Sequence, residues 1–528
     1  MKIKTVAIKN FRAYKDETVV EFGDLTTFVG KNDIGKSTVL EALDIFFNDG
    51  GGAVKLDKSD INQENVGVDT TISITVEFSD LPDSVRIDPQ NLTTLADEYL
   101  ITTTGTLKVR KEYANAGKAK IYIIANHPTN EHCKDLLLKK ITELRRILDD
   151  NNIDCDDRTR SAVIRKCIWN HYAGELNCLE IPIETSKEDA KNIYEGLETF
   201  LPLYSLFRAD RSNNDTDTEV QDPMKLAVKQ LMSRTDVVDL CNQISEIVSV
   251  ELNRVAANTL GKLQQMDPTT ANSLTPSIPS VQNLKWAEVF KSVSINSDNE
   301  IPLNKRGSGV KRLVLISFFR AEVDRRMRDP QNTNRGVIYA IEEPETSQHV
   351  KMQKMMIDSL KELSNQPGVQ VILTTHSSFV VKQLVYDNIR VIKEDNGGRR
   401  IVTPSSNILP YLSLNEINFT SFGDACEEYH NELYGQIQSY AITIDTKYAK
   451  EKEFENWLVG QGMTQTKQWK RKDGNVVKPA YNVTLQTFIR NTIHHPENKE
   501  NGEYNHEELT NSIVEMRNFI QNGYLANI

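Results

Sequence analysis

The chain has 528 residues and a mass of 59.9 kDa, which is too long for one average domain and predicts about two to four domains. Hydrophobic residues make up 39% and charged residues 26%, the balance of a globular protein. The formal net charge of −11 excludes a global basic field that recruits nucleic acid, so any such contact must be a local patch.

Neither a membrane span nor a signal segment is predicted. No run approaches the roughly 20 apolar residues of a membrane-spanning helix. Met1–Thr5 alternates like a strand and lacks an apolar signal core. We therefore expect a cytoplasmic protein without membrane contact. Six cysteines lack paired metal spacing and are predicted to be ordinary thiols of a reducing compartment: Cys133, Cys155, Cys167, Cys178, Cys241 and Cys426.

The first part of the chain has strand character. Residues 3–22 predict two strands around a turn that contains Phe11-Arg12, and residues 26–29 form a short apolar strand. Residues 71–78 alternate at period two, as a half-buried strand does. Further strands are expected at 98–103, 107–113 and 121–125.

Residues 30–37, Gly-Lys-Asn-Asp-Ile-Gly-Lys-Ser, fit the phosphate-binding loop pattern between a strand and the predicted helix 38–47. The glycines let backbone N–H groups approach a triphosphate, and the helix N-terminus adds partial positive charge. Lys36 would reach the β- and γ-phosphates, and Ser37 would hold Mg²⁺. The residues expected to bind ATP here are Gly30, Asn32, Gly35, Lys36, Ser37 and Thr38.

The character of the sequence changes near residue 128. Helical periodicity in 133–149, 186–200 and 224–266 predicts an inserted helical arm over 128–285. Its apolar seam covers too few heptads for a long coiled coil. Strand character returns after Trp286.

Two carboxylates follow a buried strand in this later part. The apolar run 337–341 is typical of a parallel strand covered on both faces, and it stops at Glu342-Glu343. We expect Glu342 to contact Mg²⁺ and Glu343 to orient or deprotonate the attacking water. The next buried strand, 369–373, leads to His376, which would sense the γ-phosphate.

A second anion-binding segment precedes these residues. Arg306, Ser308 and Gly309 lie where a helix is predicted to begin, so their N–H groups can face an anion. A second anion-binding segment has a role if it contacts the nucleotide that is bound by the loop of another copy of the chain. Hydrolysis would then require two chains, each contributing half of a site.

Taken in order, Phe11-Arg12, the loop 30–37, Gly307 to Gly309, Glu342-Glu343-Pro344 and Thr375-His376 resemble the SMC/RecF/OLD branch of ABC ATPases. The resemblance covers residues 1–125 and 286–410. It implies an α/β fold in which a split ABC-type head carries an inserted helical arm and a C-terminal helical domain, with ATP and Mg²⁺ as cofactors. The expected domains are 1–127, 128–285, 286–410 and 411–528.

Three positions qualify this resemblance. Glu342 stands where the class often has Asp, and the segment after Pro344 departs from the usual Leu/His-rich version. Gln63 is a weak candidate for the metal-sensing glutamine.

The tail, 411–528, is predicted to be helical. It lacks the Asp-x-Asp that should follow a segment such as Ile442–Thr446 in a Toprim nuclease domain. A head of this class with a short arm and compact tail resembles PtuA, the ATPase subunit of Septu and of some retron antiphage systems. That resemblance implies a homodimer or higher even-numbered homo-oligomer and a separate PtuB-like HNH nuclease. A retron reverse transcriptase with its msDNA, and nucleic acid, stay open as partners.

Two other functions stay open. Arg490-Asn491 followed by His495 resembles the spacing of HEPN ribonucleases, whereas a plain helix end or partner docking explains the same residues. A RecF-like DNA-repair clamp would need a basic stripe on the head. Lys108 and Arg110 alternate onto one face of a predicted strand, with Lys111, Lys118 and Lys120 nearby, whereas a solvated strand face explains them equally.

Overall fold

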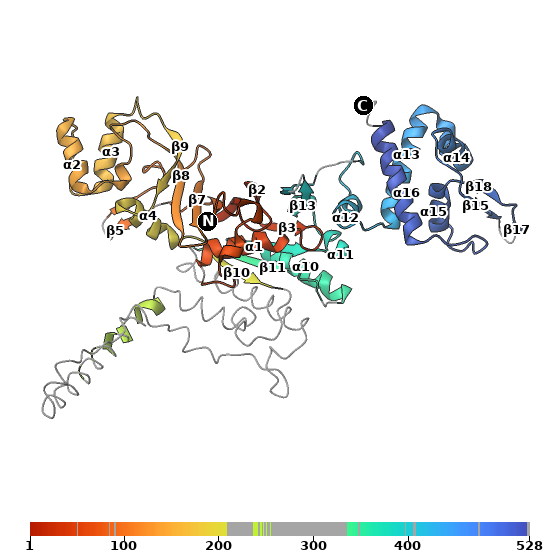
Figure 1. Ribbon diagram of the computed structural model, residues 1–528, viewed down its shortest axis with the longest axis horizontal. Helices are drawn as coiled ribbons and strands as arrows, with labels where there is room; N and C mark the ends of the chain where they lie inside the picture. The colour runs from red at the N-terminus through yellow and green to blue at the C-terminus, as the bar shows by residue number, and fades with distance from the viewer. Residues whose placement is uncertain are drawn as a thin grey trace. The chain divides into compact units, whose positions relative to one another are not determined.

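The computed structural model describes residues 1–208, 335–346, 349–404 and 408–524, except 50, 84, 89–90, 396–397 and 474–475, together with short helical pieces between 236 and 254 (Figure 1). The chain divides into two compact units. The first comprises Met1–Arg12 and Val39–Leu373, and the second comprises Ala13–Thr38 and Thr374–Ile528. The predicted helix 224–266 lies largely outside the described residues, and the predicted anion cradle, 306–309, lies wholly outside them.

An antiparallel sheet dominates the first unit. Its strands follow the order β1 (Lys2–Lys9), β4 (Thr71–Ser79), β7 (Leu107–Ala114), β8 (Lys120–His127) and β9 (Leu179–Glu184). β7 buries every second residue, so the apolar residues that alternate in the sequence all point to the buried face of the sheet. The predicted strand at 98–103 is wrong, since these residues form turns.

Parallel strands form the second layer of this unit. β10 (Leu203–Phe207) pairs with β11 (Val337–Glu342), with Leu203 opposite Val337, and β12 (Val369–Thr375) lies next to β11. The helix α10 (Val350–Ser364) joins β11 to β12. All of β12 and all but the last residue of β11 are buried, as expected of parallel strands covered on both faces. β9 and β10 fall in a region predicted to be helical.

The helices α2 (Ile141–Asp150), α3 (Ser161–His171) and α4 (Glu188–Glu198) belong to the same unit. α2 and α3 share a small apolar core that includes Leu144 and Trp169. The fully buried Arg165 is neutralised by Glu98 at 2.7 Å and by Asp189. Cys155 and Cys167 are disulfide-bonded, so the prediction of six ordinary thiols is wrong for this pair: the turn between α2 and α3 places their Cα atoms 5.8 Å apart.

The second unit contains the strand that leads into the glycine loop. β3 (Leu25–Val29) runs parallel to β13 (Ile389–Asp395), with Val29 opposite Val391. β13 continues through a hairpin into β14 (Gly398–Val402), near which lies β2 (Thr18–Glu21). The short helix α11 (Ser378–Val381) and the helix α12 (Leu414–Phe422) follow.

The rest of the second unit is mainly helical. The helices α13 (Glu427–Ile444), α14 (Glu451–Gly460), α15 (Leu485–His494) and α16 (His506–Phe519) bury one core that includes Leu433, Trp457 and Ile513. Ile442-Thr443-Ile444 ends α13, so it is not the strand of a Toprim fold. The predicted α/β fold with C-terminal helices is confirmed.

Short elements complete the described chain. The small strands are β5 (Val85–Asp88), β6 (Asn91–Thr93), β15 (Lys467–Trp469), β16 (Lys472–Asp473), β17 (Val476–Val477) and β18 (Tyr481–Val483). The short helical turns are η1 (Lys58–Asp60), η2 (Gln63–Asn65), η3 (Leu136–Leu138), η9 (Tyr386–Asn388), η10 (Thr446–Ala449) and η11 (Ile520–Tyr524). No helix among the described residues is long and apolar enough to span a membrane.

Candidate nucleotide-binding site

The glycine loop joins β3 to the helix α1 (Lys36–Asn48), as the sequence predicts. Lys36 is 5% exposed, and its Nζ donates hydrogen bonds to the carbonyls of Gly30 at 2.9 Å and Lys31 at 2.8 Å. The ammonium group is therefore held inside the curve of the loop. A cation in this position can meet the β- and γ-phosphates of a nucleotide.

Both glycines of the loop are required by their surroundings. A Cβ on Gly30 would lie 2.9 Å from Cγ2 of Ile34 and 3.2 Å from the carbonyl oxygen of Ile392. Gly35 has φ +103°, and a Cβ there would lie 3.3 Å from the hydroxyl of the buried Tyr14. That hydroxyl donates to the Gly35 carbonyl at 3.0 Å. Larger residues at either position would change the shape of the loop.

The remaining loop candidates lie where α1 begins. Asn32 and Ser37 are exposed, whereas Thr38 is 8% exposed. Unpaired N–H groups at a helix start favour an anion, and the first turn of α1 carries no acidic residue that would oppose it. The Ser37 hydroxyl is a suitable oxygen ligand for Mg²⁺, which typically binds one or two protein oxygens, substrate phosphates and water.

The two glutamates lie at the end of β11 in the first unit. Glu342 is the last residue of that strand and is half-buried. Glu343 has φ +40°, a conformation that costs an L residue about 1–2 kcal/mol. Its carbonyl accepts from the Thr346 amide at 3.1 Å. Strained backbone of this kind persists where neighbouring structure imposes it, and such positions cluster at functional sites.

His376 directly follows β12 and is exposed, whereas all seven residues of that strand are buried. The next residue, Ser377, caps α11 by accepting a hydrogen bond from the Val380 amide. The imidazole is thus presented at the carboxyl end of a strand, the edge where open α/β sheets bind ligands. The loop and His376 belong to the second unit, and the glutamates belong to the first.

One cluster of charges was not predicted. Glu41, on α1, accepts hydrogen bonds from Arg12 and from Arg208, which directly follows β10. Arg12 also pairs with Asp60 at 2.7 Å and adopts φ +48°. Glu41 lies four residues after Ser37, a spacing that places both on one side of α1. The three side chains converge from distant segments, so no local sequence signal links them.

A buried hydroxyl supports the same helix. Tyr204, on β10, donates to the Leu40 carbonyl of α1 at 2.6 Å. Burial raises the pKa of Tyr204 well above its usual value, and the carboxylates of Asp44 and Glu342 raise it further. The hydroxyl therefore stays protonated as a donor. This hydrogen bond holds α1 against β10, where Tyr204 lies opposite Ile338 of β11.

Other candidates lie apart from these groups or outside the described chain. Gln63 is exposed in η2, next to Asn62, whose side chain donates to the Arg12 carbonyl at 2.6 Å. Arg306, Ser308 and Gly309 lie outside the described residues. Among the residues that the structure describes, no group of three or more His, Cys, Asp or Glu could hold a metal.

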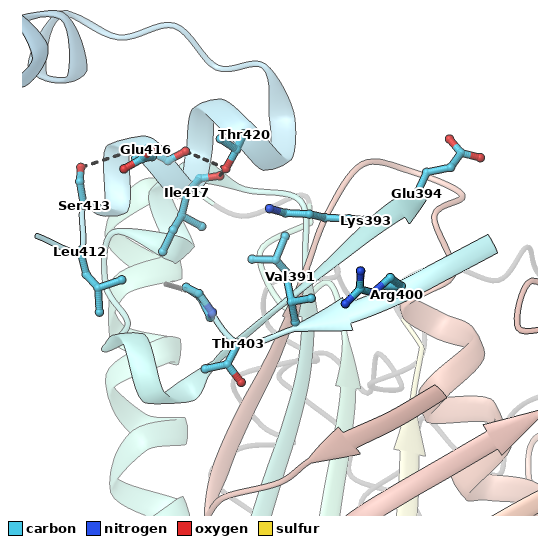
Figure 2. Close-up of a pocket in the computed structure, with 12 residues that line it drawn as sticks. Val391, Lys393, Glu394, Arg400, Thr403, Leu412, Ser413, Glu416, Ile417 and Thr420 are labelled. Carbon is cyan, nitrogen blue, oxygen red and sulfur yellow. Dashed lines mark hydrogen bonds between the residues drawn. The ribbon is translucent and has the colours of Figure 1, made fainter. Parts of the chain in front are cut away.

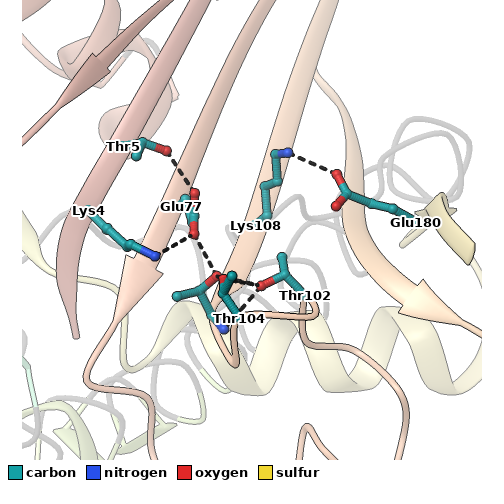
Figure 3. Close-up of polar contacts among 8 residues, drawn as sticks. Lys4, Thr5, Glu77, Thr102, Thr104, Lys108 and Glu180 are labelled. Carbon is teal, nitrogen blue, oxygen red and sulfur yellow. Dashed lines mark hydrogen bonds and ion pairs between the residues drawn. The ribbon is translucent and has the colours of Figure 1, made fainter.

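The basic strand that a DNA clamp would use is largely neutralised. Lys108 forms an ion pair with Glu180 at 2.9 Å (Figure 3), and Arg110 pairs with Glu112 at 3.0 Å. Lys111 points to the opposite face, where it is 2% exposed and donates to the Phe46 carbonyl at 2.8 Å. The alternation predicted from the sequence is present, but these cations already have acceptors within the protein.

A comparison with models of known protein families identifies the family of this chain. The model of the AAA ATPase domain family matches residues 1–381. The chain belongs to the AAA ATPase domain family. Membership of an ATPase family confirms the predicted ATPase activity, and the matched range includes the glycine loop, Glu342, Glu343 and His376. The match ends before α12, so the C-terminal helices of this ATPase lie outside it.

Two curated relatives are similar to the ATPase over part of their length. One is "Endonuclease GajA" of Bacillus cereus (strain HuB5-5), 21% identical over 448 residues, which cover 77% of this chain and 60% of the relative. The other is "Retron Vc95 probable ATPase" of Vibrio cholerae serotype O1 biovar El Tor, 20% identical over 296 residues, 51% of this chain and 55% of the relative. The chain thus spans less than two thirds of either relative.

Solved structures similar to the ATPase include SMC heads. One is the SMC head domain from Thermotoga maritima, with a TM-score of 0.32 and 13% identity over 77% of this chain and 100% of that chain. Another is the SMC head bound to the C-winged helix domain of ScpA, with a TM-score of 0.36 and 12% identity over 77% and 98%. Scores this low carry no conclusion about the ATPase.

Proposed function

We propose that this ATPase is the nucleotide-hydrolysing subunit of a bacterial antiphage defence complex and that it regulates an associated HNH nuclease. The observation that carries the proposal is the similarity of an ATPase chain to a retron ATPase and to an endonuclease. A defence role fits the resemblance of the head, the short arm and the compact tail to the PtuA class. In this proposal, ATP binding joins two heads, and the dimer state controls the nuclease.

The proposed chemistry assigns one role to each group. Lys36 and the loop N–H groups bind the β- and γ-phosphates, while Ser37 and Glu342 hold Mg²⁺, which neutralises developing charge on the phosphates. Glu343 orients the attacking water, and His376 contacts the γ-phosphate. Arg306, Ser308 and Gly309 of a second copy complete the site. Phosphoryl transfer needs mainly positioning and charge neutralisation, so these groups suffice.

The C-terminal helices are the proposed docking site for the nuclease. They form a separate core that lies beyond the family match. The strand β17 exposes Val476 and Val477, with relative exposures of 58% and 39%. Adjacent exposed valines on a short hairpin are suited to contact an apolar patch on a partner.

Co-expression with an HNH nuclease encoded beside the gene tests this proposal. We expect the pair to co-purify and to restrict phage, and we expect Lys36→Ala to abolish restriction. Val476→Asp with Val477→Asp should release the nuclease, because both side chains are exposed and the exchange leaves the helical core intact. If phage restriction is unchanged by Lys36→Ala, or the nuclease never co-purifies, the proposal fails.

A ribonuclease in the C-terminal helices is the second candidate. It is favoured by the gathering of three basic side chains at the end of α15. Burial lowers the pKa of His494, and the charges of Arg490 and His495 lower it further. Asn491 is 1% exposed and donates to Glu451 at 2.7 Å, which fixes the helix end beneath them. His495 is half-exposed, so its ring can meet a phosphate.

RNA cleavage by the purified chain separates the two candidates. If this site is catalytic, the protein alone cleaves RNA, and both His495→Ala and Arg490→Ala abolish cleavage while Lys499→Ala, on the neighbouring exposed turn, does not. Absence of cleavage by the lone chain, with cleavage restored by the added nuclease, excludes this second candidate.

A further inference from the structure

A buried tyrosine contacts the glycine loop from an earlier part of the same unit. Tyr14 follows the turn at residues 12–13, and its side chain is 0% exposed. Its hydroxyl donates to the carbonyl of Gly35 at 3.0 Å. Its ring lies against the same glycine, because a Cβ on Gly35 would lie 3.5 Å from Cε2 and Cζ of the ring. Tyr14 therefore contacts one loop residue through both its ring and its hydroxyl.

The hydroxyl of Tyr14 acts within the protein. Burial raises the pKa of Tyr14 above its usual value, whereas the positive charge of Arg399 on β14 lowers it, and the net shift is upward. The hydroxyl is therefore protonated at neutral pH. Tyr14 does not line the cavity of about 360 Å³ between the β13–β14 hairpin and α12, whose wall includes Arg400 (Figure 2). Its hydroxyl is thus a donor to Gly35 and is not presented to a ligand in that cavity.

The backbone at Gly35 needs such a restraint. Its φ of +103° is accessible to glycine, which has the widest choice of backbone conformations. A Cβ would restrict this choice, but the Tyr14 ring leaves little space for one. The peptide between Gly35 and Lys36 can therefore reorient unless another group holds it. The Tyr14 hydroxyl is a group that does so, because it binds the carbonyl of this peptide.

The orientation of this peptide decides which of its groups points away from Tyr14. The peptide is trans, so its carbonyl and N–H point in opposite directions, and the Lys36 N–H points away from the tyrosine. Lys36 is the first residue of α1, and N–H groups at the start of a helix favour an anion. If the peptide turned over, the Gly35 carbonyl would take the place of the N–H, and its partial negative charge would repel a phosphate.

We propose that Tyr14 is a positioning residue for ATP binding, whose hydroxyl keeps the N–H of the Gly35–Lys36 peptide, rather than its carbonyl, directed at the phosphates. This inference rests on the proposed role of the loop. Because Tyr14 is fully buried, it acts through Gly35 and not by touching the nucleotide. A loop that is already held in the binding orientation loses less conformational freedom when ATP binds. Loss of the hydroxyl should therefore weaken ATP binding and leave the hydrolysis step unchanged.

Tyr14→Phe in the full chain tests the proposal, because it removes the hydroxyl and keeps the ring. Titration with fluorescent ATP and steady-state hydrolysis should show Kd and KM for ATP about three- to tenfold higher, as expected for one lost hydrogen bond, with kcat unchanged. Tyr113→Phe is the matched control. Tyr113 is 4% exposed, and its hydroxyl donates to the Ile45 carbonyl of α1 at 3.5 Å, away from the loop. This control should leave Kd, KM and kcat unchanged.

Two further replacements of Tyr14 separate the hydrogen bond from the packing of the ring. 4-Aminophenylalanine places an N–H donor where the hydroxyl was, and it should return Kd and KM towards the wild-type values. 4-Methylphenylalanine has a similar size but no donor, and it should bind ATP as weakly as Tyr14→Phe does. A role limited to packing would not distinguish these two replacements. Equal affinities of the two, or equal effects of Tyr14→Phe and Tyr113→Phe, would overturn the proposal.

Lys36→Ala, titrated in parallel, separates this proposal from the role of the loop itself. If Lys36→Ala binds ATP as the wild type does, the loop is not the binding site and the proposal for Tyr14 fails with it. If Lys36→Ala does not bind ATP while Tyr14→Phe binds with wild-type affinity, the loop assignment stands and only the role of Tyr14 is rejected. Lost binding in Lys36→Ala together with weakened binding in Tyr14→Phe is the expected result.

Discussion

Arg12 forms an ion pair with Glu41, which lies five residues after Lys36 of the glycine loop. Glu41 also binds Arg208, and the side chains of Glu41 and Arg208 are only 11% and 10% exposed. The helix that begins at the loop is therefore anchored by one carboxylate between two guanidinium groups. Removing that carboxylate takes an acceptor from the poorly solvated Arg208 cation, which is the costly way to break a buried pair, whereas Arg12 keeps its pair with Asp60.

We predict that Glu41→Gln lowers the free energy of opening of α1 by about 2 kcal/mol, less than the full cost of a buried pair because Arg12 is partly exposed. Hydrogen exchange at the α1 amides measures this quantity. Glu195→Gln is the control, since its pair with Lys191 is more than half exposed and should contribute less than about 0.5 kcal/mol. Equal effects of the two exchanges would show that the cluster does not anchor α1.

We predict that Lys36→Ala abolishes ATP binding, because Lys36 is the cation enclosed by the loop. Titration with fluorescent ATP measures it. Lys31→Ala is the matched control: Lys31 supplies the loop with its carbonyl, and its side chain is exposed. Unchanged affinity in Lys36→Ala would reject the assignment of the loop.

These two predictions differ in how far the sequence alone could support them. The position of the loop between a strand and a helix was predictable, because its residues are contiguous and their glycine spacing is a known local pattern. The Arg12–Glu41–Arg208 cluster was not, since Arg208 lies 167 residues from Glu41. Only the fold brings the three side chains together. The sequence singled out Arg12 by its place in the order of motifs, but it did not predict that Glu41 and Asp60 accept its hydrogen bonds.

The fold shows the same distinction. Helices with clear periodicity, such as α1 and α4, lie within two residues of the predicted bounds, 38–47 and 186–200. β10 was missed because its five residues, Leu203–Phe207, follow a helical segment and pair with a strand more than 130 residues away. The strand expected at 98–103 has the right residue types but no partner strand, and Glu98 instead neutralises Arg165.

Two substitutions of Glu343 can separate the role of its side chain in hydrolysis from the strain in its backbone. Its φ of +40° favours glycine. We predict that Glu343→Gly abolishes turnover while leaving stability unchanged or raising it by up to about 1 kcal/mol, whereas Glu343→Ala abolishes turnover and stays strained. Phosphate release and thermal unfolding measure the two effects. Turnover that survives in both variants would place the base elsewhere.

The pH dependence of the C-terminal helices should depend on His430. Burial lowers its pKa to about 3, and the side chain contacts the Ser512 hydroxyl at 3.0 Å. The unfolded chain binds this proton near pH 6.5. The contribution of neutral His430 to the free energy of unfolding is therefore fully present above that pH and is lost progressively on acidification towards pH 3. Between pH 6.5 and 5 the loss should be about 2 kcal/mol.

His430→Gln should remove this part of the pH dependence, and His506→Gln, at the exposed start of α16, should keep it. Urea unfolding of the C-terminal helices, residues 427–519, is monitored in the full chain by pulse proteolysis at pH 7 and at pH 5. The quantity compared between variants is the loss of free energy of unfolding from pH 7 to pH 5. If wild type and His430→Gln lose the same stability on acidification, His430 is not the titrating group.

The proposed composite site predicts complementation between two inactive variants. Lys36→Ala removes one half-site and Ser308→Arg removes the other, so each chain alone should be inactive. In an equal mixture, half of the dimers are mixed, and each holds one intact pair of half-sites, so turnover should recover to about a quarter of the wild-type rate. Lys36→Ala mixed with Glu343→Gln is the control. Both of those residues act in the same half-site, so no mixed dimer regains an intact one. Recovery in the control, or none in the first mixture, would show that hydrolysis does not require Ser308 from a second chain.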